Sequence, residues 1–60
     1  MNDSIPKDPY LLLSYVNLKL RDYYSTLEDM CKSLDINQAE LVTIMAGIDY
    51  EYSADNNQFI

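Results

Sequence analysis

A single cysteine and the complete absence of histidine constrain this chain more than any other feature of its sequence. Its 60 residues can form one small domain, and a domain of that size buries only about 60% of the surface that its unfolded chain exposes. Small domains often compensate with a disulfide or a structural metal. One thiol cannot form an intrachain disulfide, and a zinc site without histidine would need carboxylate ligands. We therefore expect one domain over residues 1–60, without metal or cofactor, that is stabilised by close helix packing or by self-association.

The first expected helix follows a loose lead-in over residues 1–7. Asp8 can cap the helix and Pro9 suits its first turn, so helical structure is expected from residue 8 onward. At 100° per residue, one broad arc of this helix is apolar down to its expected end near Tyr24. The predicted core face consists of Leu12, Leu13, Val16, Leu20, Tyr23 and Tyr24.

The same helix carries a second apolar arc on its far side. Leu11, Tyr15 and Leu18 follow the spacing i, i+4, i+7. A helix that is apolar on two sides usually has two packing partners. We therefore predict an interface at Leu11, Tyr15 and Leu18, with Tyr15 as the first choice; the alternative is that this arc lies beneath the chain's own C-terminal hairpin. The polar wedge that is left is narrow, and it comprises Ser14, Asn17 and Arg21.

Two capping boxes predict two shorter helices before residue 47. The first box is Ser-Thr-Leu-Glu at residues 25–28, with Ser25 as the cap of a helix that ends around Asp35. The second is Asn-Gln-Ala-Glu at residues 37–40, and Gly47 is the expected left-handed stop of its helix. The apolar stripes are Leu27, Met30, Cys31 and Leu34 in the first helix and Leu41, Ile44, Met45 and Ile48 in the second.

After Gly47 the apolar period changes from 3.6 to 2, because Ile48, Tyr50 and Tyr52 alternate with polar residues. Residues 54–57 (Ala-Asp-Asn-Asn) have the composition of a turn, so residues 48–60 should form a small hairpin. The expected fold is mainly α: a three-helix domain with a helix-turn-helix-like pair and a small C-terminal β-hairpin, similar to a winged helix.

The distribution of charge argues against nucleic acid as a partner. Residues 33–60 contain five acids and no base, within a net charge of −6 for the chain. Phosphate neutralisation supplies most protein–DNA affinity, so direct DNA binding is disfavoured, and a partner protein with a basic surface fits better. A winged-helix-like, transcription-associated protein is the alternative function. Acidic mimicry of nucleic acid is a third possibility.

No set of residues has the spacing of a catalytic site. The acids lack the pattern of paired catalytic carboxylates or of a calcium loop, and there is no glycine-rich phosphate loop or evident small-molecule site. Cys31 lies within an apolar stripe, where a buried and unreactive thiol is expected. The acidic start at residues 1–4 and the short apolar stretches predict a cytoplasmic protein that neither enters nor binds a membrane.

Several short motifs along the chain are informative in combination. They are Pro6-Lys7-Asp8-Pro9, Leu12-Leu13-Ser14, Asn17, Lys19-Leu20-Arg21-Asp22-Tyr23-Tyr24, Leu27, Cys31, Tyr50-Glu51-Tyr52 and Asn57-Gln58-Phe59. Together they resemble a family of short bacterial proteins known as domain of unknown function 4250. The resemblance implies a bacterial cytosolic protein of this size, and it implies no particular activity, ligand or catalytic residue. We therefore expect a small, acidic, non-enzymatic domain that binds a protein partner or itself.

Overall fold

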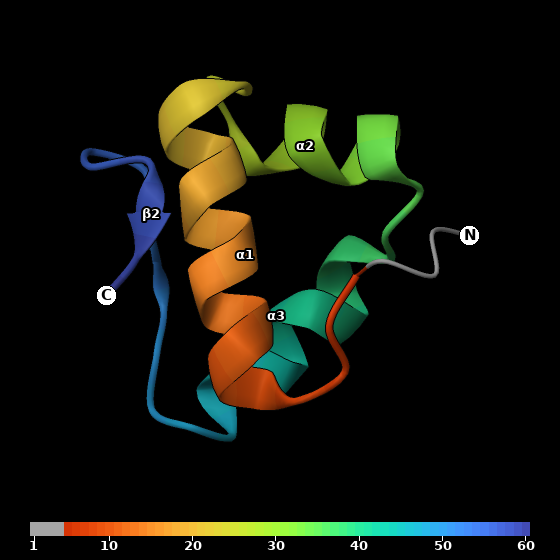
Figure 1. Cartoon of the computed structure of the whole chain (residues 1–60). Coiled ribbons are helices and arrows are strands. Elements are labelled where there is room, and N and C mark those ends of the chain that lie inside the picture. Colours follow the sequence, from red (N-terminus) through yellow and green to blue (C-terminus); the bar gives the residue numbers. More distant parts are fainter. Residues whose placement is uncertain (1–4) are drawn as a thin grey trace.

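A computed structural model describes residues 5–60 and confirms the expected fold class, with three helices followed by a two-stranded antiparallel hairpin (Figure 1). In the hairpin, Tyr52 lies opposite Phe59 and Ser53 opposite Gln58. Of the expected lead-in, residues 1–4 lie outside the described residues, while Ile5 packs against the core. The elements are α1 (Pro9–Asp22), α2 (Leu27–Leu34), α3 (Gln38–Ala46), β1 (Tyr52–Ser53) and β2 (Gln58–Phe59).

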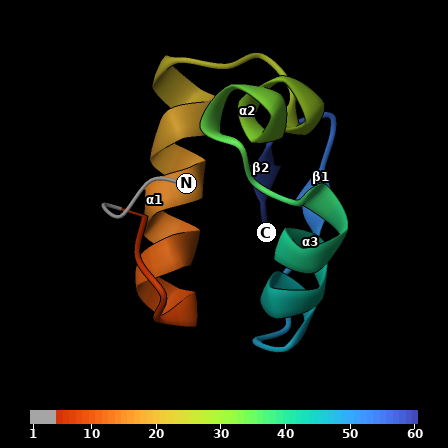
Figure 2. The same ribbon diagram turned by 90° about the vertical axis from the view of Figure 1, so that its right-hand side faces the viewer.

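The helix α1 is the centre of the fold. In Figure 1 it stands between the hairpin on one side and α2 with α3 on the other, and Figure 2 shows the hairpin behind the helices. Each of these elements contributes apolar side chains to one core except β1, whose Tyr52 packs against it from the edge. The buried members are Leu12, Val16, Leu20, Leu27, Met30, Cys31, Leu41, Met45 and Phe59.

The caps of α1 and α3 are those predicted. The Asp8 carboxylate accepts hydrogen bonds from the Tyr10 and Leu11 amides, each at 3.1 Å. The Asn37 side chain accepts one from the Glu40 amide at 3.0 Å. These contacts satisfy amide groups that the first turn of a helix leaves without partners.

The cap of α2 differs from the prediction, because Thr26 and not Ser25 precedes the first helical residue. Thr26 has extended backbone angles, and its hydroxyl accepts a hydrogen bond from the Asp29 amide at 3.0 Å. Both residues carry a hydroxyl that can cap a helix, so composition alone did not distinguish them. As predicted, α2 stops at Asp35, which has a φ of 56°.

Gly47 is not the left-handed stop that its position predicted, since its φ of −63° is right-handed. Its amide is within hydrogen-bonding distance of the Thr43 and Ile44 carbonyls, so the helical turn continues through it. The left-handed residue comes two positions later, at Asp49 with a φ of 68°. Aspartate tolerates this conformation better than most residues.

The hairpin is shorter than the alternating pattern predicted. Residues 48–50 belong to the turn after α3, because the Ile48 and Tyr50 amides both donate to the Met45 carbonyl at 3.0 Å. Pairing begins at Glu51, whose backbone exchanges two hydrogen bonds with Ile60. The turn at residues 54–57 is confirmed.

Tyr23 was wrongly predicted to lie on the core face of α1. The helix ends at Asp22, and the φ of −125° at Tyr23 departs from helical geometry, so the 100° rule no longer gives its direction. Its side chain is 68% exposed, whereas Leu13 and Tyr24 pack against the core as half-buried residues.

Candidate interaction surfaces

We call Leu11, Tyr15 and Leu18 the outer face of α1. Leu11 is 62% exposed and Leu18 is 44% exposed, whereas Leu12, Val16 and Leu20 on the other side of α1 are buried. Tyr15 is half-buried and packs against the core, so the two leucines provide the more open part of this face. The alternative prediction, that the hairpin covers this arc, does not hold for Leu11 and Leu18.

The hairpin is held on the opposite flank of α1 by two asparagine side chains. The Asn17 carboxamide donates to the Phe59 carbonyl at 3.1 Å and accepts from the Phe59 amide at 2.8 Å. The Asn57 carboxamide donates to the carbonyls of Leu20 and Tyr24, both at 2.9 Å. Asn17 is therefore a half-buried structural residue and not part of a solvated polar wedge. In the sequence, the signal for this contact was a polar asparagine next to the apolar core face of the helix. Its partner, Phe59, lies 42 residues away, so the contact itself could not be predicted.

Charges of both signs flank the outer face of α1. Arg21 makes a bidentate pair with Asp22, with Nε to Oδ1 at 2.9 Å and Nη2 to Oδ2 at 3.0 Å. Hydrogen bonding to Arg21 holds the pKa of the Asp22 carboxyl below its usual range, and the same contact raises the pKa of the Arg21 guanidinium. The Lys19 ammonium lies 4.7 Å from the ring centroid of Tyr23 and 5.4 Å from that of Tyr15.

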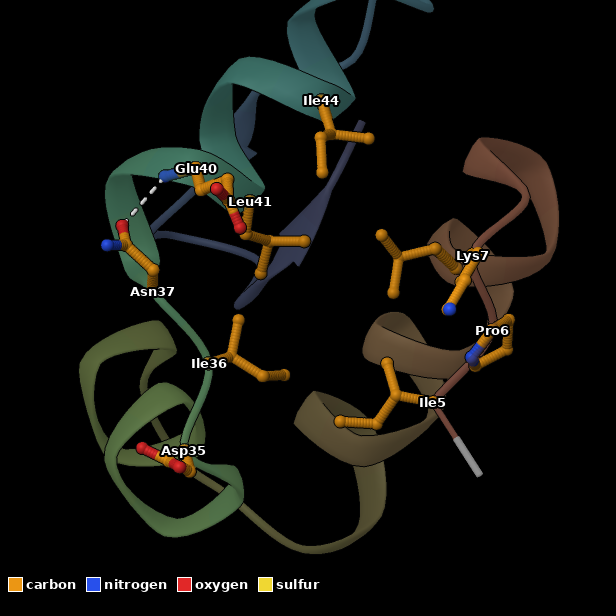
Figure 3. A pocket seen from close by; sticks show the side chains of 10 residues that line it. Ile5, Pro6, Lys7, Asp35, Ile36, Asn37, Glu40, Leu41 and Ile44 are labelled. Carbon is orange, nitrogen blue, oxygen red and sulfur yellow. Dashed lines mark hydrogen bonds between the residues drawn. The ribbon is translucent and has the colours of Figure 1, made fainter. Parts of the chain in front are cut away.

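A second surface, which we call the α3 groove, lies between the lead-in, α1 and α3. It is a hollow of about 280 Å³ that is lined by the aliphatic side chains of Ile5, Leu12, Ile36, Leu41 and Ile44. Figure 3 shows the four isoleucine and leucine side chains labelled there converging from the lead-in, the turn after α2, and α3. Lys7, Asp35 and Glu40 stand among its polar lining residues.

Ile44 was predicted in the core stripe of α3, and the structure corrects this. Its side chain is 36% exposed and lines the α3 groove, whereas Leu41 and Met45 of the same stripe are buried. The rest of the fold covers only part of the apolar stripe of α3, so Ile44 at the edge of this stripe stays partly exposed. Two other hollows on the described surface are more open to solvent and have a more polar lining.

Comparison with known proteins assigns the chain to a family. The model of the domain of unknown function DUF4250 matches residues 6–59, nearly the whole chain. The chain belongs to the DUF4250 family. No curated protein and no solved structure is significantly similar to it.

The DUF4250 chain contains the predicted helix-turn-helix-like pair, formed by α2, the turn at residues 35–37 and α3. The exposed residues at the start of α3 are Gln38, Ala39 and Glu40. The Thr43 hydroxyl donates to the Ala39 carbonyl at 2.9 Å. No base lies on α3 or after it, so this helix offers no cation to a phosphate. Likeness to a winged helix stays a prediction.

The chemistry available elsewhere in the DUF4250 chain is limited. Cys31 is buried, and loss of hydration raises the pKa of its thiol, which keeps it in the less nucleophilic protonated form. Within residues 5–60, no three potential ligands lie close enough together to hold a metal ion. In the same part of the chain, none of the helices has the length and apolar character needed to cross a membrane.

Proposed function

We propose that this DUF4250 protein is a non-catalytic interaction domain of the cytoplasm that pairs with a second copy of itself through the outer face of α1. The observation that carries the proposal is the exposure of Leu11 and Leu18, two aliphatic residues on the side of α1 that the rest of the fold does not cover. Covering such side chains stabilises by about 25 cal/mol for each Å² of apolar surface removed from water. A domain of 60 residues has a small hydrophobic core, so covering two further leucines would add substantially to its buried apolar surface.

The charge pattern favours a second copy as the partner on this face. A symmetric dimer interface must be complementary to itself. The outer face of α1 meets this condition because it is apolar at its centre and has Lys19, Arg21 and Asp22 nearby, so that each copy offers both signs. The remainder of the surface is less suitable, since residues 33–60 have five acids and no base and would repel the same region of another copy.

Sedimentation equilibrium between about 1 and 100 µM, a range that spans dissociation constants typical of weak dimers, tests the proposal. We expect the unmodified chain to show a concentration-dependent dimer and Leu18→Glu to be monomeric. Val42→Glu is the matched control, because Val42 is also an exposed aliphatic residue, at 40% against 44%, but lies on α3. It should dimerise normally. A chain that stays monomeric throughout, or that loses association equally in both variants, contradicts the proposal.

A winged-helix-like role in transcription is the second candidate, favoured by the order of α2, α3 and the hairpin. Its test is a gel shift with duplex DNA at about 50 mM salt, where electrostatic binding is strong. We expect no shift, because α3 and the hairpin carry no base. A shifted complex at this salt concentration would favour the second candidate.

A further inference from the structure

We propose that the α3 groove binds a short segment of another protein that presents one or two aliphatic side chains next to lysine or arginine. This site is distinct from the outer face of α1: apart from Leu12 its lining comes from the lead-in, the turn after α2, and α3. It therefore does not depend on the proposed dimer.

The lining of the groove indicates the kind of ligand. Its volume of about 280 Å³ is close to the lower limit of roughly 300 Å³ usual for small-molecule sites. Ile5, Ile36 and Ile44 bring aliphatic groups to it from three separate segments (Figure 3). Anchor side chains of a docked peptide typically fill apolar hollows of this kind. The groove has room for one or two such side chains.

Charge at the groove selects a basic partner. Two acids, Asp35 and Glu40, line the groove together with one base, Lys7. The α3 side of the groove belongs to residues 33–60, which contain five acids and no base. A lysine or arginine next to the anchor would lie in this acidic field, whereas the same region of a second copy would be repelled. Nucleic acid is excluded from the proposal because its phosphates would meet both the acids and an aliphatic lining.

The test is a titration of the ¹⁵N-labelled full chain with a blocked peptide that has two leucines between two pairs of lysines. The Leu18→Glu background is run in parallel, so that failure of the dimer does not affect the result. We expect a dissociation constant on the order of 10⁻⁴ M, with the largest amide shifts at Ile36, Leu41 and Ile44. Peptides with alanine for leucine, or with glutamate for lysine, should bind at least about tenfold more weakly.

Two matched pairs of variants locate the binding site. Ile44→Glu should weaken the lysine-leucine peptide about tenfold or more, while Val42→Glu, an equal charge change at a 40% exposed residue outside the groove, should change the constant less than about threefold. Glu40→Gln should weaken binding about two- to fivefold. Glu51→Gln, which removes the same charge in the hairpin, should have a smaller effect.

Four results would overturn the proposal. Equal effects of Ile44→Glu and Val42→Glu would place the peptide elsewhere, and equal binding of the glutamate peptide would remove the role of charge. Groove amides that shift with protein concentration alone would make a second copy the occupant. A nuclear Overhauser contact between the Met1 methyl group and Ile44 in the free chain would make the chain's own N-terminus the occupant.

Discussion

Asn17 of α1 and Phe59 of β2 are joined by a pair of hydrogen bonds, from the Asn17 carboxamide to the Phe59 carbonyl and from the Phe59 amide back to Asn17. In the observed register, Glu51 and Ile60 exchange backbone hydrogen bonds, so the polar groups of Phe59 point away from β1. The single side chain of Asn17 satisfies both. A two-stranded hairpin is marginal alone, and this contact fixes it to the longest helix.

Asn17→Ala should lower the free energy of unfolding by about 1–3 kcal/mol, because it leaves both backbone groups of Phe59 without their partner. Urea denaturation followed by circular dichroism measures the change. Ser14→Ala on the same helix is the control and should stay within about 0.5 kcal/mol of the unmodified chain, since Ser14 is exposed. Equal stability of the two variants would mean that the Asn17 contact does not hold the hairpin.

Glycine variants at Asn57 and Asp49 separate the effect of side-chain hydrogen bonds on stability from that of backbone strain. It has a φ of 51°, and its side chain also accepts a 2.6 Å hydrogen bond from the Tyr52 hydroxyl. Asn57→Gly should destabilise by about 2 kcal/mol because the lost bonds outweigh the relief of strain. Asp49→Gly, at a φ of 68°, should be neutral or stabilise by up to about 1 kcal/mol. Thermal unfolding of both variants checks the comparison; a stabilising Asn57→Gly would contradict it.

The raised pKa of Cys31 predicts a loss of stability at alkaline pH. Burial favours the protonated thiol in the folded chain, so this contribution is complete below the pKa of the unfolded thiol and is lost as pH rises through the higher folded value. We therefore compare urea unfolding of the unmodified chain and of Cys31→Ala at neutral and alkaline pH. The difference between the two should shrink with rising pH; a constant difference would rule out this linkage.

The lowered pKa of Asp22 predicts the opposite dependence. Its hydrogen bond to Arg21 favours the ionised carboxyl, so the contribution of the pair is present above the ordinary carboxyl pKa and is lost as pH falls through the lowered value. Arg21→Gln should raise the pKa of Asp22 in a carboxyl-detected NMR titration. Lys19→Gln should leave it nearly unchanged, because Lys19 faces aromatic rings. Both side chains are exposed, so little change in global stability is expected.

Local interactions explain what could be predicted from the sequence. The caps at Asp8 and Asn37, the end of α2 at Asp35 and the buried position of Cys31 depend on residues within a few positions of one another. Helix periodicity likewise placed Leu11 and Leu18 on a side of α1 away from its core face, and both are exposed. What binds there stays a prediction.

The sequence by itself therefore determined the order of the elements and the apolar faces of the helices, because caps and periodicity act over one or two turns. Only the tertiary structure decided that Asn17 binds Phe59 and that Ile5 and Ile44 share one groove. It also decided that Tyr23 points outward once the helix has ended. These outcomes depend on which segments, far apart in the chain, come into contact. Local patterns of capping and periodicity carry no information about such contacts.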